Sequence, residues 1–177
     1  MKNLKFDQNN TSFLEFSILS QSDKSGNNHF SPFTELNRNN GLIKIGFLGK
    51  DSCWEYEQGN TIQQLSTLEF ISKNQNKILE SLFIYTKEKL YPEHIGYIGF
   101  DETSFPELRN INDLRKALGI NLISIYYEHK NDLSYFGLTC DFSGDYEHGT
   151  NIIMHKSKVL GWEENMGKGK VIEDLKI

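Results

Sequence analysis

The sequence predicts an α+β fold, with a mainly antiparallel twisted sheet and helices packed on one face. Strand patterns occupy the first and last thirds of the chain, and helix patterns occupy the middle. The strand–helix–strand alternation that builds a parallel sheet is missing from this order. A chain of 177 residues can bury one core of its own. We therefore expect a single domain over residues 1–177, with loosely ordered ends at residues 1–10 and 163–177.

Strand patterns dominate the N-terminal third. Residues 4–6 indicate a brief edge strand, and alternating apolar residues indicate a second strand over Ser12–Leu19. A third strand is expected over Leu42–Leu48, and a turn then pairs it with a hairpin strand over Cys53–Tyr56. Between the second and third strands the chain is rich in Ser, Asn and Gly, which predicts an exposed loop.

Helical spacing of apolar residues begins after residue 60. Thr61 and Gln64 form the Thr-x-x-Gln pattern of a capping box, in which each side chain bonds the backbone N–H of the other residue. Polar residues at 72–77 interrupt the apolar stripe, so two helices or one kinked helix are expected, with Asn74 as a second N-cap and Pro92 as the stop. The residues expected to face the core are Ile62, Leu65, Leu68, Phe70 or Ile71, Ile78, Leu79, Leu82 and Phe83.

A weaker pattern connects the helices to the last third of the chain. Residues 91–106 are expected to be irregular, with His94 at the surface. A short helix is expected over Asn112–Leu118, with Asn110 or Asn112 as its N-cap and Gly119 as its C-terminal cap. This helix delivers the chain into the final strands.

The last third predicts a meander of antiparallel strands joined by short turns. The strands are expected over Asn121–Tyr127, Leu133–Phe142, Asn151–His155 and Val159–Trp162. Because side chains alternate along a strand, one face carries Phe136, Leu138, Cys140 and Phe142, and this face should be core, with Cys140 a buried free thiol. The opposite face carries Tyr135, Gly137, Thr139 and Asp141, which suits solvent or a covering loop. After Trp162 we expect a flexible tail, to which Val171 and Ile172 add an edge strand.

The connection Ser143–Gly149 is the most polar part of the meander. We expect Asp145, Glu147 and His148 to hydrogen-bond the loop's own backbone, and Gly149 to end it in a geometry that a Cβ would oppose. A metal or acid–base site is the alternative, with candidate ligands Asp141, Asp145, Glu147, His148 and His155. None of the established ligand spacings is matched, so the sequence predicts neither a metal nor a cofactor.

These segments also carry a resemblance to a known family. Tyr135–Phe142, Asp145–Gly149 and Ile153–Val159 resemble the C-terminal signature of a family of bacterial domains of unknown function, in which six residues separate a Cys from Glu-His-Gly. The resemblance extends from about Gly41 to Trp162. It implies no activity for the chain. It implies a genomic context, because such domains resemble small accessory or immunity proteins encoded near polymorphic and secreted bacterial toxins.

Charge restricts the class of partner. The chain has 24 acidic and 19 basic residues and a net charge of −5. This balance argues against binding to nucleic acid or to an anionic membrane, and it permits a basic protein partner. The first residues contain no apolar run typical of a signal peptide, and no stretch approaches the length of a membrane span, so a cytoplasmic protein is expected.

Three functional hypotheses remain open. The leading one is a non-enzymatic bacterial protein-binding domain, an immunity protein that neutralises a toxin by binding it. Its candidate contact residues are Trp54, Asp145, Glu147, His148, Gly149, Trp162, Glu163 and Glu164. The second is a hydrolase-like or metal-binding enzyme that uses the loop around Asp145, Glu147 and His148. The third is a structural or regulatory module of a larger assembly. The oligomeric state is not predicted.

Overall fold

The computed structural model describes residues 4–6, 12–16, 42–50, 61–98, 105–164 and 167–176. The described strands form one seven-stranded sheet whose spatial order follows the sequence, β1-β2-β3-β4-β5-β6-β7. They are β1 (Leu4–Phe6), β2 (Ser12–Glu15), β3 (Leu42–Phe47), β4 (Leu118–Lys130), β5 (Leu133–Phe142), β6 (Asp145–His155) and β7 (Lys158–Glu163). Neighbouring strands are antiparallel except β3 and β4, which are parallel.

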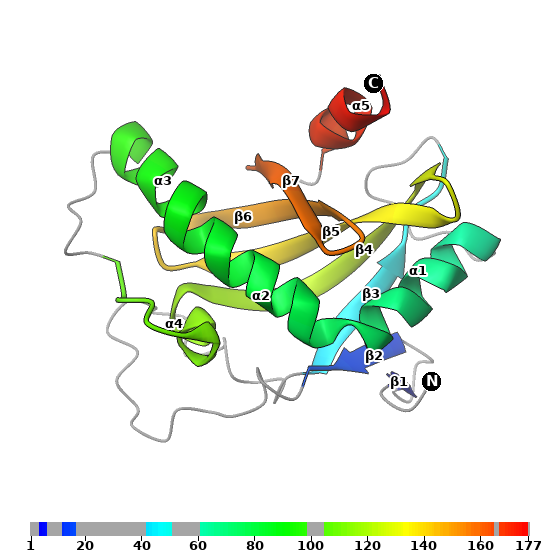
Figure 1. The fold of residues 1–177 in the computed structure, drawn as a ribbon, viewed down its shortest axis with the longest axis horizontal. Helices are drawn as coiled ribbons and strands as arrows, with labels where there is room; N and C mark the ends of the chain where they lie inside the picture. Colours follow the sequence, from blue (N-terminus) through cyan, green and yellow to red (C-terminus); the bar gives the residue numbers. More distant parts are fainter. Residues whose placement is uncertain are drawn as a thin grey trace.

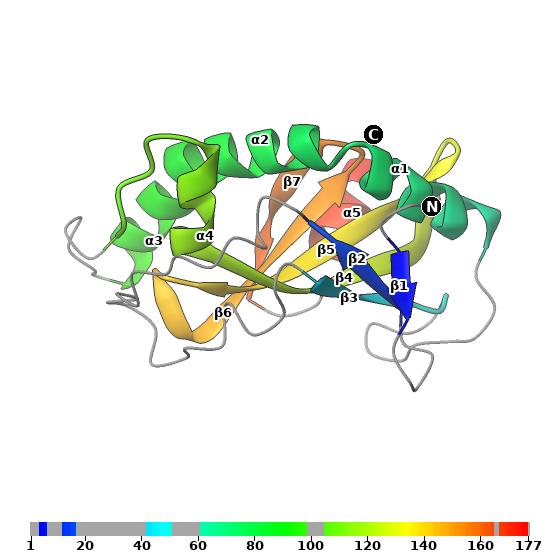
Figure 2. The ribbon, with the colours of Figure 1, turned by 90° about the horizontal axis from the view of Figure 1, so that it is seen from below.

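Helices cover one face of this sheet (Figures 1 and 2). In chain order they are α1 (Ile62–Lys73), α2 (Gln75–Tyr85), the π-helical segment η2 (Thr86–Leu90), α3 (Tyr91–Ile98), the 3₁₀ turn η4 (Ile111–Asp113) and α4 (Leu114–Ala117). Because β3 and β4 are parallel, the chain has to cross between them, and all of these helices lie in that crossing. The α+β class and the mainly antiparallel sheet predicted from the sequence are confirmed.

The main core lies between this sheet face and the helices. The alternation predicted for β5 is confirmed, since Phe136, Leu138, Cys140 and Phe142 are all at most 2% exposed. They pack with residues of β3, β4 and β6 and with the helices, including Ile43, Ile45, Leu68, Ile71, Leu79, Leu82, Ile123, Ile125, Ile152 and Met154. The C-terminal strands and the helical layer therefore form one apolar core.

The helical face of α1 differs from the prediction. The capping box is present, with Thr61 N donating to Gln64 Oε1 at 2.9 Å and Gln64 N donating to Thr61 Oγ1 at 3.1 Å. Ile62, however, is 79% exposed and Leu65 44% exposed, so their predicted place in the core is wrong. The buried positions are Gln64, Thr67, Leu68 and Ile71.

Two of those buried residues are polar, because they bond the backbone of the sheet. Gln64 Nε2 donates to Leu48 O at 2.9 Å and to Ile125 O at 3.1 Å. Thr67 Oγ1 accepts from Ser134 N at 2.7 Å. Hydrogen bonds of this kind make a polar side chain acceptable in a buried position, which an apolar-periodicity argument cannot anticipate.

The helix also continues through Pro92, where the sequence predicted a stop. The preceding segment η2 is π-helical, and Tyr91 N donates to Thr86 O five residues back. A proline inside an α-helix clashes with the carbonyl four residues earlier, and it also lacks a backbone donor. The wider π turn directly before Pro92 lets the helical path continue into α3. Residues 91–98 are therefore helical, and the predicted irregular segment begins too early.

The short helix before β4 also ends earlier than predicted. Asn110 is the N-cap, and its side chain accepts from Asn112 N at 2.9 Å. The helical turn ends at Ala117, and Gly119 lies inside β4, where it pairs with Asp141 of β5. The prediction of Gly119 as a C-terminal cap is wrong because sheet pairing already begins at Leu118, opposite Phe142.

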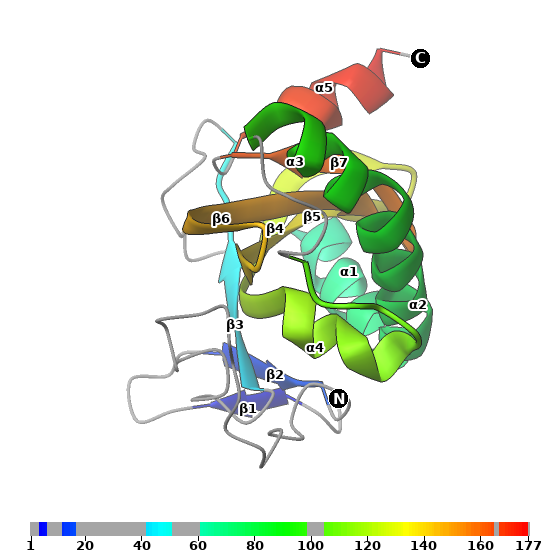
Figure 3. The ribbon, with the colours of Figure 1, turned by 90° about the vertical axis from the view of Figure 1, so that its left-hand side faces the viewer.

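A fifth helix, α5 (Gly169–Leu175), replaces the predicted flexible tail and edge strand. In Figure 1 it lies apart from the other helices, beyond β7, and Figure 3 shows it at the top of the molecule, on the far side of β7 from β1 and β2. Its buried residue Val171 packs with Leu48, Tyr126, Tyr135 and Ile153 in a second apolar cluster. These strand residues alternate with those of the main core, so α5 covers part of the opposite sheet face. Tyr135 is consequently fully buried, and the element that covers it is a helix, where the sequence predicted solvent or a covering loop.

Candidate functional site at the α3–β7 end of the sheet

Two aromatic rings, those of His94 and Trp162, pack against each other in a tilted arrangement where α3 meets the end of β7. His94 of α3 is 1% exposed, and its ring lies 4.4 Å from the Trp162 ring and 4.6 Å from the Phe142 ring, centroid to centroid. Its Nδ1 is 2.9 Å from Leu90 O, a carbonyl that can only accept, so Nδ1 carries a proton. The prediction that His94 is a surface residue is therefore wrong, because α3 turns this side chain into the sheet.

Three carboxylates lie near enough to the His94 ring for their charges to act on it, those of Glu93, Asp145 and Glu164. Glu93 Oε2 accepts from Trp162 Nε1 at 2.7 Å, which fixes the indole edge against α3. Burial lowers the pKa of His94, while its bond to Leu90 O and the negative charges of Asp145, Glu93 and Glu164 act in the opposite direction. Burial dominates, so the neutral ring is favoured. We call the surface formed by Glu93, Asp145, Glu164 and the edge of Trp162 the acidic surface.

The β5–β6 hairpin positions Asp145. The predicted loop Ser143–Gly149 is shorter in the structure, since only Ser143 and Gly144 form the turn and β6 begins at Asp145. Asp145 pairs with Phe142, whereas Thr150 already pairs with Cys140, so residues 146–149 bulge opposite a single residue of β5. Such a bulge bends the strand locally and interrupts the regular pairing.

Gly149 permits the bulge to close. Its φ is +69°, and an added Cβ would lie 2.5 Å from Cys140 O. The predicted requirement for glycine is confirmed. Asp145 Oδ1 accepts from His148 N at 3.1 Å and lies 3.2 Å from His148 Nδ1. These contacts support the interpretation that the Asp145 carboxylate hydrogen-bonds the backbone of the segment it belongs to, between β5 and the regular part of β6.

The structure brings together only some of the predicted site residues. Asp145, Trp162 and Glu164 lie around His94, and His148 contacts Asp145. Trp54 and the Glu147 side chain lie outside the described residues. Among the side chains that are described, no group of three or more His, Cys, Asp or Glu residues is placed to hold a metal ion. His155 is at the other end of β6, where its ring lies 4.7 Å from that of Tyr135.

Glu163 points away from the acidic surface. Its Oε1 accepts from Lys170 N at 2.7 Å, in the first turn of α5. Glu163 therefore helps to hold α5, while Glu164 beside it is exposed. Glu93 of the acidic surface and the buried His94 were not predicted as site residues. The spacing of Leu90, Tyr91 and His94 fits one helical face, but the assumption that Pro92 ends the helix concealed it.

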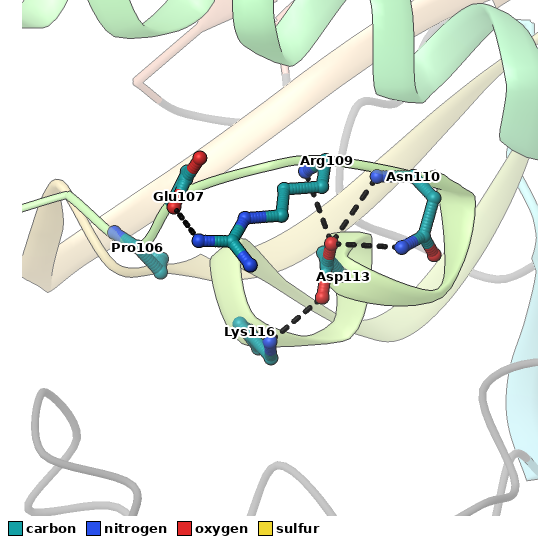
Figure 4. Close-up of a pocket in the computed structure, with 6 residues that line it drawn as sticks. All are labelled: Pro106, Glu107, Arg109, Asn110, Asp113 and Lys116. Carbon is teal, nitrogen blue, oxygen red and sulfur yellow. Dashed lines mark hydrogen bonds and ion pairs between the residues drawn. The ribbon is translucent and has the colours of Figure 1, made fainter.

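A separate open hollow lies beside α4 (Figure 4). It has a volume of about 470 Å³ and is lined by Pro106, Glu107, Arg109, Asn110, Asp113 and Lys116. Its two cations are already neutralised, since Arg109 pairs with Glu107 and Lys116 pairs with Asp113, both at 2.7 Å. The other Asp113 oxygen accepts from the backbone of Arg109 and Asn110. These groups stabilise the start of the helical turn, so we do not assign the hollow a ligand.

Fold and site together define an α+β domain with a twisted sheet, a helical layer and an acidic, aromatic-edged surface at one end of that layer. The chain belongs to the family described as Domain of unknown function (DUF6985), whose model matches residues 26–167. Of the described elements, β1, β2 and α5 lie outside this range. No curated protein and no solved structure matches the chain significantly. None of the described helices is both long and apolar enough to cross a membrane.

Proposed function

We propose that this domain binds a basic protein partner through the acidic surface, as a bacterial immunity protein that neutralises a toxin by occupying it. The observation that carries the proposal is the grouping of three carboxylates, from Glu93, Asp145 and Glu164, near the Trp162 and His94 rings. Tryptophan is enriched among residues that contribute most to protein–protein binding, and acidic side chains accelerate association with a basic partner. The net charge of −5 has the same sign.

The described chemistry favours binding over catalytic turnover. The Asp145 carboxylate already accepts from the backbone of His148, which is a structural use of a candidate acid or base. Burial raises the pKa of the Cys140 thiol, and this side chain is 2% exposed, so it does not present a thiolate nucleophile. A catalytic carboxylate and a reactive cysteine both need access to substrate.

The immunity role rests on the family resemblance. The chain resembles bacterial domains found near secreted toxins, and a cytoplasmic location is part of the proposal, because an immunity protein must meet its toxin in the cell that makes it. A basic enzyme domain is the class of partner that an acidic surface fits. Such a domain would be blocked if its cleft were covered by the carboxylates and the indole edge.

The test begins with the products of the genes next to this one. Each basic product is expressed with and without this domain, and growth and direct binding are measured. Protection together with binding is expected for one product. If no neighbouring product binds and none is neutralised, the proposed immunity function is wrong.

Charge variants then locate the binding surface. The triple variant Glu93→Gln, Asp145→Asn and Glu164→Gln removes three charges, while its amides keep acceptors for Trp162 Nε1 and His148 N. The matched control neutralises three exposed acids elsewhere, Glu69, Glu80 and Glu107. Both variants change the net charge equally, so only their positions differ.

The site variant should reduce the association rate constant about tenfold at low salt and flatten its salt dependence. The control should stay within about twofold of the wild type because its three carboxylates lie outside the acidic surface and are not among the charges that act on His94. Equal slowing by both variants would show that net charge alone matters, and the assignment to the acidic surface would then be wrong.

A further inference from the structure

We propose that the second sheet face, beneath α5, is a binding groove for a short helix of a partner protein, and that α5 occupies this groove as a displaceable plug. The groove lies on the sheet face opposite the main core, so this inference is independent of the acidic surface. Its first support is the extent of the family. The matched region ends at residue 167, and α5 begins at Gly169. The helix that covers this face therefore lies just outside the matched residues.

The second support is the way in which the sheet holds α5. At the N-terminal end, Glu163 Oε1 accepts from Lys170 N at 2.7 Å. At the C-terminal end, Tyr135 OH donates to Asp174 Oδ2 at 2.9 Å, and Lys130 Nζ donates to the same oxygen at 3.0 Å. The groove therefore supplies an acceptor where a helix has free N–H groups and two donors where the helix carries a carboxylate.

The third support is the small apolar contact between these two ends. Val171 is the described residue of α5 that enters the sheet, where it packs with Leu48, Tyr126, Tyr135 and Ile153, each at most 1% exposed. The other apolar side chains of α5, Ile172 and Leu175, are 45% and 43% exposed. A docked element with one buried side chain leaves most of its own surface in solvent.

These features make α5 displaceable. A seven-residue helix has too few internal hydrogen bonds to persist in water, so α5 exists as a helix only while it is docked. Elements with few buried contacts open locally without global unfolding. Release of α5 would uncover Tyr126, Tyr135 and Ile153 as an apolar strip with the polar groups of Glu163 and Lys130 at its two ends.

The contacts also define the helix that the groove accepts. An aliphatic residue fills the position of Val171, and a carboxylate three residues later meets Tyr135 and Lys130. Residues three apart lie on one face of a helix, so both reach the sheet together. The expected ligand is therefore a partner segment that can form a helix and contains an aliphatic residue followed at the third position by Asp or Glu.

Hydrogen exchange on the full-length chain tests the plug. The amides of α5 should exchange by local opening, faster than those of β5 in the main core. Asp174→Asn should accelerate exchange in α5 about tenfold, because it removes the charged acceptor of two hydrogen bonds, and leave β5 unchanged. The control Glu173→Gln, whose carboxylate pairs with Lys170 at the surface, should leave α5 near the wild-type rate. Exchange of α5 only by global unfolding would overturn the proposal.

A synthetic peptide spanning residues 167–176 then tests the groove. Titrated into the full-length Asp174→Asn protein and followed by NMR, it should shift the signals of Tyr135 and Ile153 and bind more tightly than to the wild type. The same peptide with Val171→Asp should not bind. Failure of the wild-type peptide to bind the variant, or equal binding of both peptides, would refute a specific groove. A dimer formed by exchange of α5 between two copies would show that the second copy, and not a partner, is the occupant.

Discussion

Gln64 joins the first helix to the sheet, and its removal should cost more than the loss of a helix cap. Its backbone and Oε1 form the capping box with Thr61, and its Nε2 donates to Leu48 O and Ile125 O. Leu48 directly follows β3, and Ile125 lies in β4, the strand that pairs with β3 in parallel. One side chain thus joins the start of α1 to both strands.

The cost of Gln64→Met follows from the partners that it leaves behind. Ile125 O still accepts from Leu48 N at 2.9 Å, so it keeps a donor. Leu48 O loses the Gln64 donor in a buried environment, which costs about 1–3 kcal/mol. Loss of the Gln64 half of the capping box adds roughly 0.5–1 kcal/mol. We expect Gln64→Met to lower the free energy of unfolding by about 2–4 kcal/mol.

Two further variants separate these contributions in urea unfolding followed by circular dichroism. Thr61→Ala removes the capping hydroxyl alone and should cost about 1 kcal/mol. Gln63→Met makes the same chemical change at the neighbouring residue, which is not among the buried positions of α1, and should stay within about 0.5 kcal/mol of the wild type. If Gln64→Met costs no more than Thr61→Ala, the bonds to Leu48 and Ile125 do not stabilise the fold as argued.

Three other expectations concern the hairpin, the core and the packed rings. Gly149→Ala should destabilise the protein by about 2 kcal/mol or more in the same assay, because of its positive φ and the close approach of Cys140 O; a neutral effect would contradict the bulge geometry. In a Cys53→Ser background, Cys140 should react with a thiol reagent only as fast as the protein unfolds, and rapid native labelling would contradict its burial. Burial lowers the pKa of His94, so the unfolded state binds more protons, and stability should fall as the pH is lowered through about 6.5, the ordinary pKa of His, toward the lower pKa of the folded state. His94→Phe should reduce that fall, although His155, whose pKa burial also lowers, retains part of it; an unchanged pH profile would show that His94 does not contribute.

The sequence predicted the fold best where one physical requirement determined each residue. In β5, burial of one face dictates the alternation of Phe136, Leu138, Cys140 and Phe142, and the structure confirms all four. The prediction of which side of α1 faces the core was wrong. Gln64 and Thr67 are buried because they form hydrogen bonds to the sheet, and the spacing of apolar residues does not indicate such bonds. The extension through Pro92 depends on a π turn, which has no simple sequence signature.

The candidate site was predicted only in part, because its residues come from distant segments. Asp145 was correctly placed at the hairpin, and Trp162 and Glu164 at the end of β7. Nothing in the local sequence brings Glu93 and His94 to them. The chain leaves α3, passes through β4, β5 and β6, and returns to α3 only at the end of β7. Contacts between residues far apart in sequence follow from topology and packing, which periodicity does not specify.

The end of β7 connects the two surfaces proposed for this domain. Trp162 lies on the side of the main core, where its ring packs against that of His94 and its Nε1 donates to Glu93 Oε2. Glu163, the next residue, points to the opposite face and holds the first turn of α5. This division follows directly from the two-residue period of a strand, which sends neighbouring side chains to opposite faces. The acidic surface and the contact that holds α5 therefore begin at two adjacent residues of the same strand, on opposite faces of the sheet.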